Sequence, residues 1–364
     1  MVITTLPTPA LVVDEARVRA NIIRWQGLAN QYGVALRPHI KTHKTIEIAR
    51  MQVAAGAKGI TSAKLSEAEV FIDAGFTDCF IAYPIIGADK CAHAAQLALR
   101  CNLIVGVDSL AGIAQLSAAM QTAGATIGVR VEIDTGLHRC GVAPTLATEL
   151  CRAVLATPGL TLDGIFTYRG AWFAGANGRS GTELGIEESQ MMVAVANELR
   201  ASGIAINAIS VGSTPTGAGA VQVPGISEIR PGTYVFGDDM QLCSGACTVE
   251  QVGLAIWCTV ISRPDAHTAT IDAGAKTFSG DVVPDRMGLR GYATAVNFDA
   301  TLVRMSEEHG VLQLAPGVDL PIGTRIAMRP IHVCTTVNLS DTMYLQGTDG
   351  DCTPIQVVAR GKRS

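Results

Sequence analysis

A lysine flanked by histidines stands at the end of a short apolar run. Residues 34–41 are rich in aliphatic side chains, and from position 37 the chain reads Arg-Pro-His-Ile-Lys-Thr-His-Lys. An amine at the end of a buried strand is partly desolvated, which favours its neutral form and frees it for Schiff-base chemistry. Lys41 is therefore a candidate for covalent catalysis, and His39 would shape its surroundings. A solvated lysine in a basic loop is the alternative.

A segment of small residues, Gly212-Ser213-Thr214, closes another apolar run, and Pro-Thr-Gly follows it. Small side chains leave backbone N–H groups accessible, and such groups can cradle a phosphate. Barrels built from alternating strands and helices commonly bind phosphate after their seventh and eighth strands. The segment 212–214 ends the seventh of the apolar runs between residues 34 and 238. Its place in the order therefore favours a phosphate site, with an ordinary glycine-rich turn as the alternative.

His332 and Cys334 lie two residues apart in a β-type run. Residues at that spacing on a strand project from the same face. Imidazole and thiolate so placed can share one metal ion, and Zn²⁺ suits that pair of ligands. The alternative is a buried cysteine beside a hydrogen-bonded histidine.

The periodicity of the chain predicts a scaffold that brings such strand ends together. Between residues 34 and about 238, short Val- and Ile-rich runs alternate with segments of helical period, such as 65–74, 111–123 and 186–202. Eight such units predict a (β/α)8 TIM barrel, an α/β fold whose active site lies at the C-terminal ends of its strands. The predicted strands are 34–41, 59–64, 79–83, 102–108, 126–134, 162–168, 208–214 and 228–237.

Beyond residue 250 the pattern changes to β-branched runs separated by turn-forming residues. We expect a barrel over residues 15–245 and a mainly β domain over 1–14 plus 246–364, which would carry the metal ligands. The opening strand, 10–14, would pair with the later domain. The predicted later strands are 255–263, 268–272, 312–316, 325–337 and 355–359.

Composition excludes several classes of protein. The 364 residues are 48% hydrophobic and 16% charged with a net charge of -4, so the chain lacks the cationic excess that binds nucleic acid. Every apolar run ends well before the roughly 20 residues of a membrane span. The N-terminus resembles no export signal, and the ten scattered cysteines are typical of reduced thiols, so we expect a cytoplasmic protein.

Taken together, these stretches resemble the D-threonine aldolase and D-serine dehydratase family, pyridoxal-phosphate enzymes with the alanine-racemase type of fold. The similarity runs over nearly the whole chain. The histidine-to-lysine block, 36–44, and the last block, 330–334, are its most specific parts. The remaining landmarks are residues 8–14, 139–142, 230–234 and 306–310.

The resemblance implies a role for each of several residues. Lys41 would hold pyridoxal phosphate as a Schiff base, Arg139 would donate to the phenolic oxygen of its ring, and Tyr168 would lie near the pyridine nitrogen. His39 would belong to the same cofactor site. The residues implied at the phosphate are Gly212, Ser213, Thr214 and Tyr234.

The metal site and its neighbourhood separate the two chemistries of the family. His332 and Cys334 would hold a divalent metal, Zn²⁺ before Mn²⁺ or Mg²⁺. Aldolases of the family typically have Asp where this chain has Cys334, and they carry a histidine shortly after the tyrosine, whereas residues 168–174 contain none. Both departures favour dehydration. Arg169 would recognise a carboxylate on a larger substrate such as D-threo-3-hydroxyaspartate.

The resulting prediction is a lyase that uses pyridoxal phosphate and a metal to dehydrate a D-β-hydroxy-α-amino acid to a 2-oxo acid and ammonia. D-Serine, D-threonine and D-threo-3-hydroxyaspartate are the substrate types. Aldol cleavage to glycine and an aldehyde is the closest alternative, followed by an amino-acid racemase and a non-catalytic carrier of the cofactor. The resemblance also implies a homodimer.

Overall fold

The chain divides into two compact units. The computed structural model describes residues 1–172, 176–282 and 284–364. The unit that we call the β unit contains Met1–Ile23, Thr42–Glu47 and Thr233–Gly361. The second, the barrel unit, contains Arg24–Lys41, Ile48–Gly232 and Lys362–Ser364.

The barrel unit contains one sheet of eight parallel strands, in the order β2-β9-β8-β7-β6-β5-β4-β3. A parallel bridge between His39 and Thr61 links the segment after β2 to β3 and joins the two ends of this order. All eight predicted strands are thus present, and the predicted barrel fold is confirmed. Their bounds are β2 Ala35–Leu36, β3 Ile60–Ser62, β4 Asp78–Pro84, β5 Asn102–Val107, β6 Ile127–Glu132, β7 Leu160–Phe166, β8 Ala208–Val211 and β9 Glu228–Ile229.

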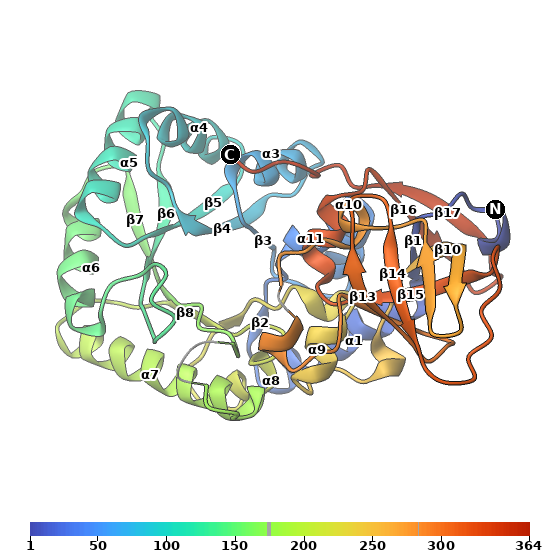
Figure 1. The fold of residues 1–364 in the computed structure, drawn as a ribbon. Helices are drawn as coiled ribbons and strands as arrows, with labels where there is room; N and C mark the ends of the chain where they lie inside the picture. Colours follow the sequence, from blue (N-terminus) through green and yellow to red (C-terminus); the bar gives the residue numbers. More distant parts are fainter. Residues whose placement is uncertain (173–175, 283) are drawn as a thin grey trace. The chain divides into compact units, whose positions relative to one another are not determined.

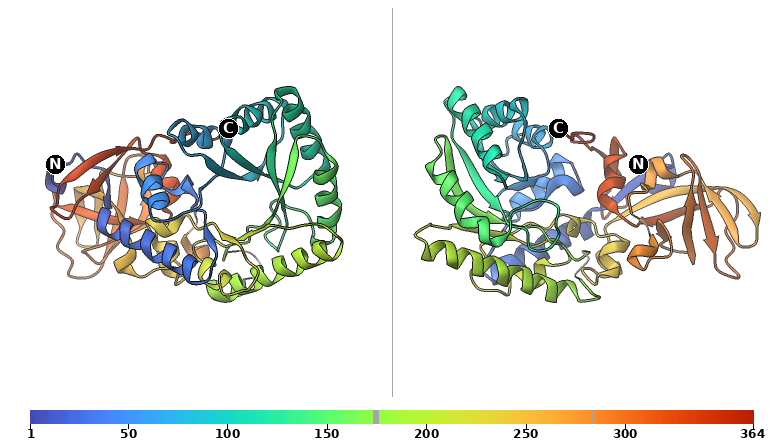
Figure 2. Two further views of the ribbon diagram at one scale, coloured as in Figure 1. Left: turned by 180° about the vertical axis from the view of Figure 1, so that it is seen from behind. Right: turned by 60° about the vertical axis from the view of Figure 1, so that its left-hand side comes forward.

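A helix follows each of the strands β2 to β8, and the helices after β4 to β7 lie outside the sheet (Figure 1; Figure 2, left). Side-chain caps set some of their ends: Ser180 and Glu183 form a capping box at the start of α7, and Ser109 caps α5. Within the described part of the chain, no helix is both long and apolar enough to cross a bilayer. The helices are α1 Glu15–Gln31, α2 Ile46–Ala54, α3 Leu65–Asp73, α4 Ala88–Ala98, α5 Leu110–Ala123, α6 Ala147–Ala156, α7 Gly181–Ala201 and α8 Gly217–Ala220.

Charged side chains fill part of the barrel interior. The buried Glu228 carboxylate accepts hydrogen bonds from Arg37 and Arg130. Burial alone would raise the pKa of Glu228, but the two guanidinium groups hold it well below its usual range. Pairing of this kind is what allows a carboxylate to remain ionised inside a core. The barrel interior is therefore ion-paired rather than purely apolar.

The β unit is built on a nine-stranded sheet with the order β11-β14-β13-β12-β15-β10-β1-β16-β17. β10 also pairs with β11, so six of the strands form a closed ring. β1 pairs antiparallel with β10 and parallel with β16, which confirms the predicted pairing of the opening strand. The bounds are β1 Ala10–Asp14, β10 Leu254–Asp265, β11 Thr268–Ile271, β12 Ala293–Ala295, β13 Ala300–Met305, β14 Gly310–Leu314, β15 Arg325–Pro330, β16 Thr342–Gln346 and β17 Cys352–Gln356.

The predicted strand 325–337 is wrong in its second half. β15 ends at Pro330, and a short helix, α11 (Val333–Asn338), follows with His332 as its N-cap. The β-branched composition of 333–337 favours a strand, but the buried carboxylate of Asp238 accepts the Val333 N–H at 3.0 Å and stabilises the start of a helix instead. The β unit also contains the short helices α9 (Asp239–Cys243) and α10 (Ala275–Phe278).

Candidate active site

Lys41 lies in the turn that follows β2, at the C-terminal end of that strand. The turn is a 3-10 helix, Ile40–Thr42, and Lys41 is half-buried within it. The backbone N–H of His39 donates to the Pro231 carbonyl at 2.9 Å, which fixes the start of the turn. The Lys41 N–H lies 3.5 Å from Nδ1 of His39. The barrel thus presents this lysine where the active sites of such folds lie.

Two cationic side chains approach the ring of Tyr168, which follows β7. Nζ of Lys41 lies 5.9 Å and Cζ of Arg139 lies 5.0 Å from the ring centroid. Tyr168 is accessible to solvent on part of its surface, since 38% of the residue is exposed. The structure therefore brings together three residues that the sequence assigned to the cofactor, and their donors surround an aromatic face.

Arg169 lies beside this group but points its guanidinium toward α7. The residue is only 2% exposed, and its Nη2 donates to the Leu184 carbonyl at 2.8 Å. Nη1 pairs with the carboxylate of Glu187 at 3.2 Å. A substrate carboxylate at Arg169 would have to replace Glu187. Phe173 and Ala174, the last residues of the histidine-free segment 168–174, lie outside the described residues.

The predicted phosphate segment turns sharply after β8. Gly212 has a φ of +77°, a conformation that favours glycine, and its N–H donates to Oε1 of Glu188 at 3.1 Å. The N–H of Ser213 donates to Oγ1 of Thr216 at 2.9 Å. These two N–H groups already have acceptors, so a phosphate here would use other donors around Thr214 or displace these acceptors.

Two further features concern the phosphate residues. One of them, Tyr234, is 2% exposed and lies in the 3-10 turn Thr233–Val235 of the β unit. The other feature is the carboxyl group that accepts from Gly212. Glu188 is fully buried on α7, which raises its pKa to about 7, and its Oε2 has no hydrogen-bond partner among the residues that the structure describes. A carboxyl group in this state is uncharged in mildly acidic solution and supports the turn at Gly212 as a neutral acceptor.

His332 and Cys334 meet in the β unit, although they do not share a strand. The Cys334 thiol lies within hydrogen-bonding reach of the His332 imidazole. Its Sγ also lies 3.2 Å from Oγ1 of Thr42 and 3.6 Å from Oγ1 of Thr233. The two predicted metal ligands are therefore together, in a polar setting of hydroxyl groups.

Two aspartates hold this pair, and neither was predicted from the sequence. Oδ2 of Asp281 lies 2.7 Å from Nδ1 of His332. Asp238, fully buried, holds the N–H of Val333 between the two ligands, and burial raises its pKa to about 6. Although burial lowers the pKa of His332, the neighbouring Cys334 and Asp281 raise it to about 11. These surroundings stabilise positive charge at the imidazole and would favour a bound cation for the same reason.

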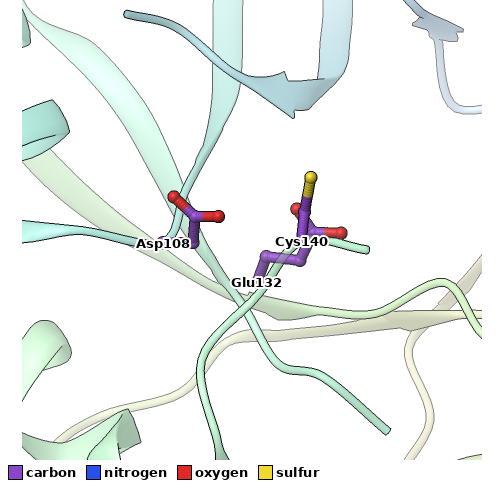
Figure 3. Close-up of side chains that lie close together, drawn as sticks. All are labelled: Asp108, Glu132 and Cys140. Carbon is purple, nitrogen blue, oxygen red and sulfur yellow. The ribbon is translucent and has the colours of Figure 1, made fainter. Parts of the chain in front are cut away.

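A second group of chemically active side chains lies beside Arg139 in the barrel unit. Asp108, Glu132 and Cys140 offer ligand atoms within 4.8 Å of one another, from the ends of β5 and β6 and the following loop (Figure 3). Burial raises the pKa of Glu132 to about 7 despite the opposing charge of Arg139, and within the described part of the chain its Oε2 has no hydrogen-bond partner. A carboxyl group with this pKa can hold or release a proton near neutral pH. Nothing in the spacing of these residues along the chain signals that they converge.

Comparison with known proteins gives the same picture as the geometry. Residues 13–240 match the family described as alanine racemase, N-terminal domain, and residues 253–346 match a putative serine dehydratase domain. D-threo-3-hydroxyaspartate dehydratase from Delftia sp. (strain HT23) is 36% identical, covering 91% of this chain and 92% of that protein. D-threonine aldolase from Arthrobacter sp. is 34% identical, covering 93% and 88%.

A solved structure extends the similarity to three dimensions. A cysteine-to-alanine variant of D-threo-3-hydroxyaspartate dehydratase, in its metal-free form, aligns with a TM-score of 0.90 and 33% identity over 98% of each chain. Fold and sequence thus define an enzyme of the alanine-racemase type, a class that depends on pyridoxal phosphate. Within that class, the chain belongs to the family of D-threonine aldolase and D-serine dehydratase, and it is a lyase.

Proposed function

We propose that this enzyme dehydrates a D-β-hydroxy-α-amino acid to a 2-oxo acid and ammonia. The substrate class is that of D-threo-3-hydroxyaspartate, D-serine and D-threonine. The observation that carries the proposal is the thiol of Cys334 beside the imidazole of His332. The relative from Delftia that is named a dehydratase supports the same chemistry.

His332 and Cys334 form a donor set that fits a divalent metal. Nitrogen and sulfur ligands suit Zn²⁺ better than Mg²⁺ or Mn²⁺, which prefer oxygen. The metal-free state of the cysteine variant in the related dehydratase supports a cysteine as a ligand in this family. We therefore propose zinc, held by these two residues and by solvent or substrate oxygen.

The residues around Tyr168 fit pyridoxal phosphate. Lys41 supplies an amine for covalent attachment, and Arg139 supplies a donor for an anionic ring oxygen. His39 supports the turn that carries Lys41, while the turn at Gly212, Ser213 and Thr214, together with Tyr234, would hold the phosphate. When bound, the cofactor supplies an electron sink at the substrate Cα and the metal supplies a Lewis acid at the β-hydroxyl.

In this proposal the chain's own residues move the proton. Once the substrate has taken its place, the Lys41 amine accepts the α-proton. The β-hydroxyl then departs, and the proton that Lys41 has accepted, or one from solvent, converts it to water; hydrolysis of the released enamine gives the 2-oxo acid and ammonia. Arg139 would donate to the phenolic oxygen of the cofactor ring, and Tyr168 would lie near its pyridine nitrogen.

Aldol cleavage to glycine and an aldehyde is the second candidate. The 34% identity to a D-threonine aldolase supports it. In that reaction the bond between Cα and Cβ breaks, so the α-proton stays on the carbon. The two reactions therefore differ in their products and in the fate of one hydrogen.

A substrate panel tests the proposal. D-threo-3-Hydroxyaspartate, D-serine and D-threonine are incubated with the enzyme, with Zn²⁺ or with a chelator, and 2-oxo acid and glycine are measured. With substrates deuterated at Cα, we expect 2-oxo acid in the presence of zinc and loss of the deuterium to solvent. Glycine that retains the deuterium would support aldol cleavage instead. Full activity in the presence of chelator would refute the role of the metal.

We also propose a cytoplasmic homodimer. All ten cysteines are thiols in the structure, which agrees with a reducing compartment. Equilibrium sedimentation of the cofactor-loaded protein would measure the oligomeric state.

A further inference from the structure

One carboxylate, that of Asp281, is bound to His332 and fixed by two hydroxyl groups. Its Oδ2 accepts the hydrogen bond from Nδ1 of His332 at 2.7 Å. Its Oδ1 accepts from Oγ1 of Thr335 at 2.8 Å and from Oγ of Ser279 at 2.9 Å. Three donors thus hold both oxygens of one side chain.

The backbone around Asp281 is also unusual. Ser279 has a φ of +66°, which residues with a side chain rarely adopt, and it directs its hydroxyl to Asp281 two positions on. Strained residues of this kind persist only where the surrounding structure imposes them, and they gather at functional sites. Within the β unit, this turn serves to present Asp281 to the imidazole.

The hydrogen bond has a direct consequence for the chemistry of His332. Because the carboxylate accepts from Nδ1, the proton on that nitrogen is retained, so Nε2 is the nitrogen that would give up its proton and offer a lone pair when a metal binds. A histidine that binds a metal needs this tautomer, and the carboxylate also makes the imidazole a better donor. Cys334 lies next to the same imidazole, so the imidazole nitrogen and the sulfur would bind one cation together.

We propose that Asp281 is a positioning residue that orients His332 and sets its tautomer for metal binding. This inference rests on the proposed function, because it presupposes a metal at His332 and Cys334. Asp281 does not itself bind the metal: its two oxygens are occupied by His332, Thr335 and Ser279.

The test measures zinc affinity directly, by competition between the cofactor-loaded full chain and a chromophoric chelator. Asp281→Asn removes the charge and the preference for the Nδ1–H tautomer, so we expect zinc to bind about 10–100-fold more weakly. Asp281→Glu restores the carboxylate and should recover part of the loss. Asp285→Asn, an exposed carboxylate in the following turn, is the matched control and should bind zinc as the unchanged protein does.

Thr335→Val supplies a second, milder variant. It removes one donor to Oδ1 of Asp281 while it keeps the charge and the volume. We expect a loss of affinity of a few fold, and this variant decides the question if Asp281→Asn does not fold. Unchanged affinity in a folded Asp281→Asn, or in Thr335→Val when it alone folds, would overturn the role of Asp281.

The same titration separates this inference from the proposed function. If the unchanged protein and His332→Ala bind zinc equally, the metal site itself is wrong and the role of Asp281 falls with it. If His332→Ala abolishes binding but Asp281→Asn does not weaken it, the metal site stands and only the positioning role is refuted.

Discussion

Nζ of Lys41 lies 5.9 Å from the centre of the Tyr168 ring, although the two residues follow β2 and β7, far apart in the chain. Closure of a parallel barrel brings all strand ends to one face, so residues from distant strands meet there. Arg139 approaches the same ring from the loop after β6. Three strand ends thus build one site around a tyrosine.

Replacement of Lys41 tests the covalent role of its amine. Lys41→Ala should abolish the visible absorbance of a Schiff base and lower turnover by about 10²–10⁴-fold, since both attachment and proton transfer are lost. The measurements are the absorbance spectrum and the mass of the peptide after borohydride reduction. Lys58→Ala, which removes an exposed lysine, is the control. A reduced adduct in Lys41→Ala would show that another lysine carries the cofactor.

Replacement of Arg169 tests how the enzyme selects its substrate. If its guanidinium binds a second substrate carboxylate, Arg169→Ala should lower kcat/KM for D-threo-3-hydroxyaspartate by about 10–100-fold relative to D-serine, because charge-assisted hydrogen bonds contribute roughly 1.5–3 kcal/mol. Glu187→Gln should favour the dicarboxylate, because it removes the competing internal partner. Equal losses for both substrates would instead assign Arg169 a structural role at α7.

The barrel was predictable because its signal is local. Strands such as β5 and β6 are short, mostly buried runs, and each run could be recognised without its neighbours. The segment 325–337 misled the prediction because Asp238, distant in sequence, decides where the strand ends. Contacts of that kind leave no trace in the residues that they control.

The site was predictable only in part, for a related reason. Lys41 and His332 with Cys334 lie in short, distinctive motifs, whereas their supporting residues do not. Asp281 reaches His332 from another loop, and Glu132 meets Asp108 only because β5 and β6 are neighbours in the sheet. Such partners depend on tertiary pairing, which a single sequence does not specify.

Replacement of Gly185 tests how closely α7 packs against the segment that follows the turn at Gly212. An added Cβ at Gly185 would overlap the carbonyl oxygen of Thr216, so the helix and the turn approach without room for a side chain. Gly185→Ala should therefore force a backbone shift that costs about 1–3 kcal/mol of stability and weakens cofactor binding. Gly27→Ala is the matched control: its Cβ meets nothing within 4 Å in α1, so a gain of about 1 kcal/mol is expected. Thermal unfolding and cofactor titration measure both effects, and equal behaviour of the two variants would contradict the tight contact.

The raised pKa of Glu188 predicts how the free energy of unfolding depends on pH. Burial raises its pKa from 4.5 to about 7, so between these values the folded chain holds a proton that the unfolded chain has released. The free energy of unfolding must then fall as the pH rises through this window. The stabilising contribution is complete below pH 4.5 and lost above pH 7, and it amounts to roughly 3 kcal/mol at 1.36 kcal/mol for each pH unit.

Glu188→Gln removes this dependence while keeping an acceptor for the Gly212 N–H. The amide stays neutral, so the variant should be more stable than the unchanged protein above pH 7, by up to roughly 3 kcal/mol. The difference should shrink toward pH 4.5. Glu198→Gln, an exposed site on the same helix, controls for the substitution itself. Unfolding curves measured from pH 4.5 to 8 give the difference at each pH. Parallel curves for Glu188→Gln and the unchanged protein would mean that the buried carboxyl titrates alike in the folded and unfolded chain.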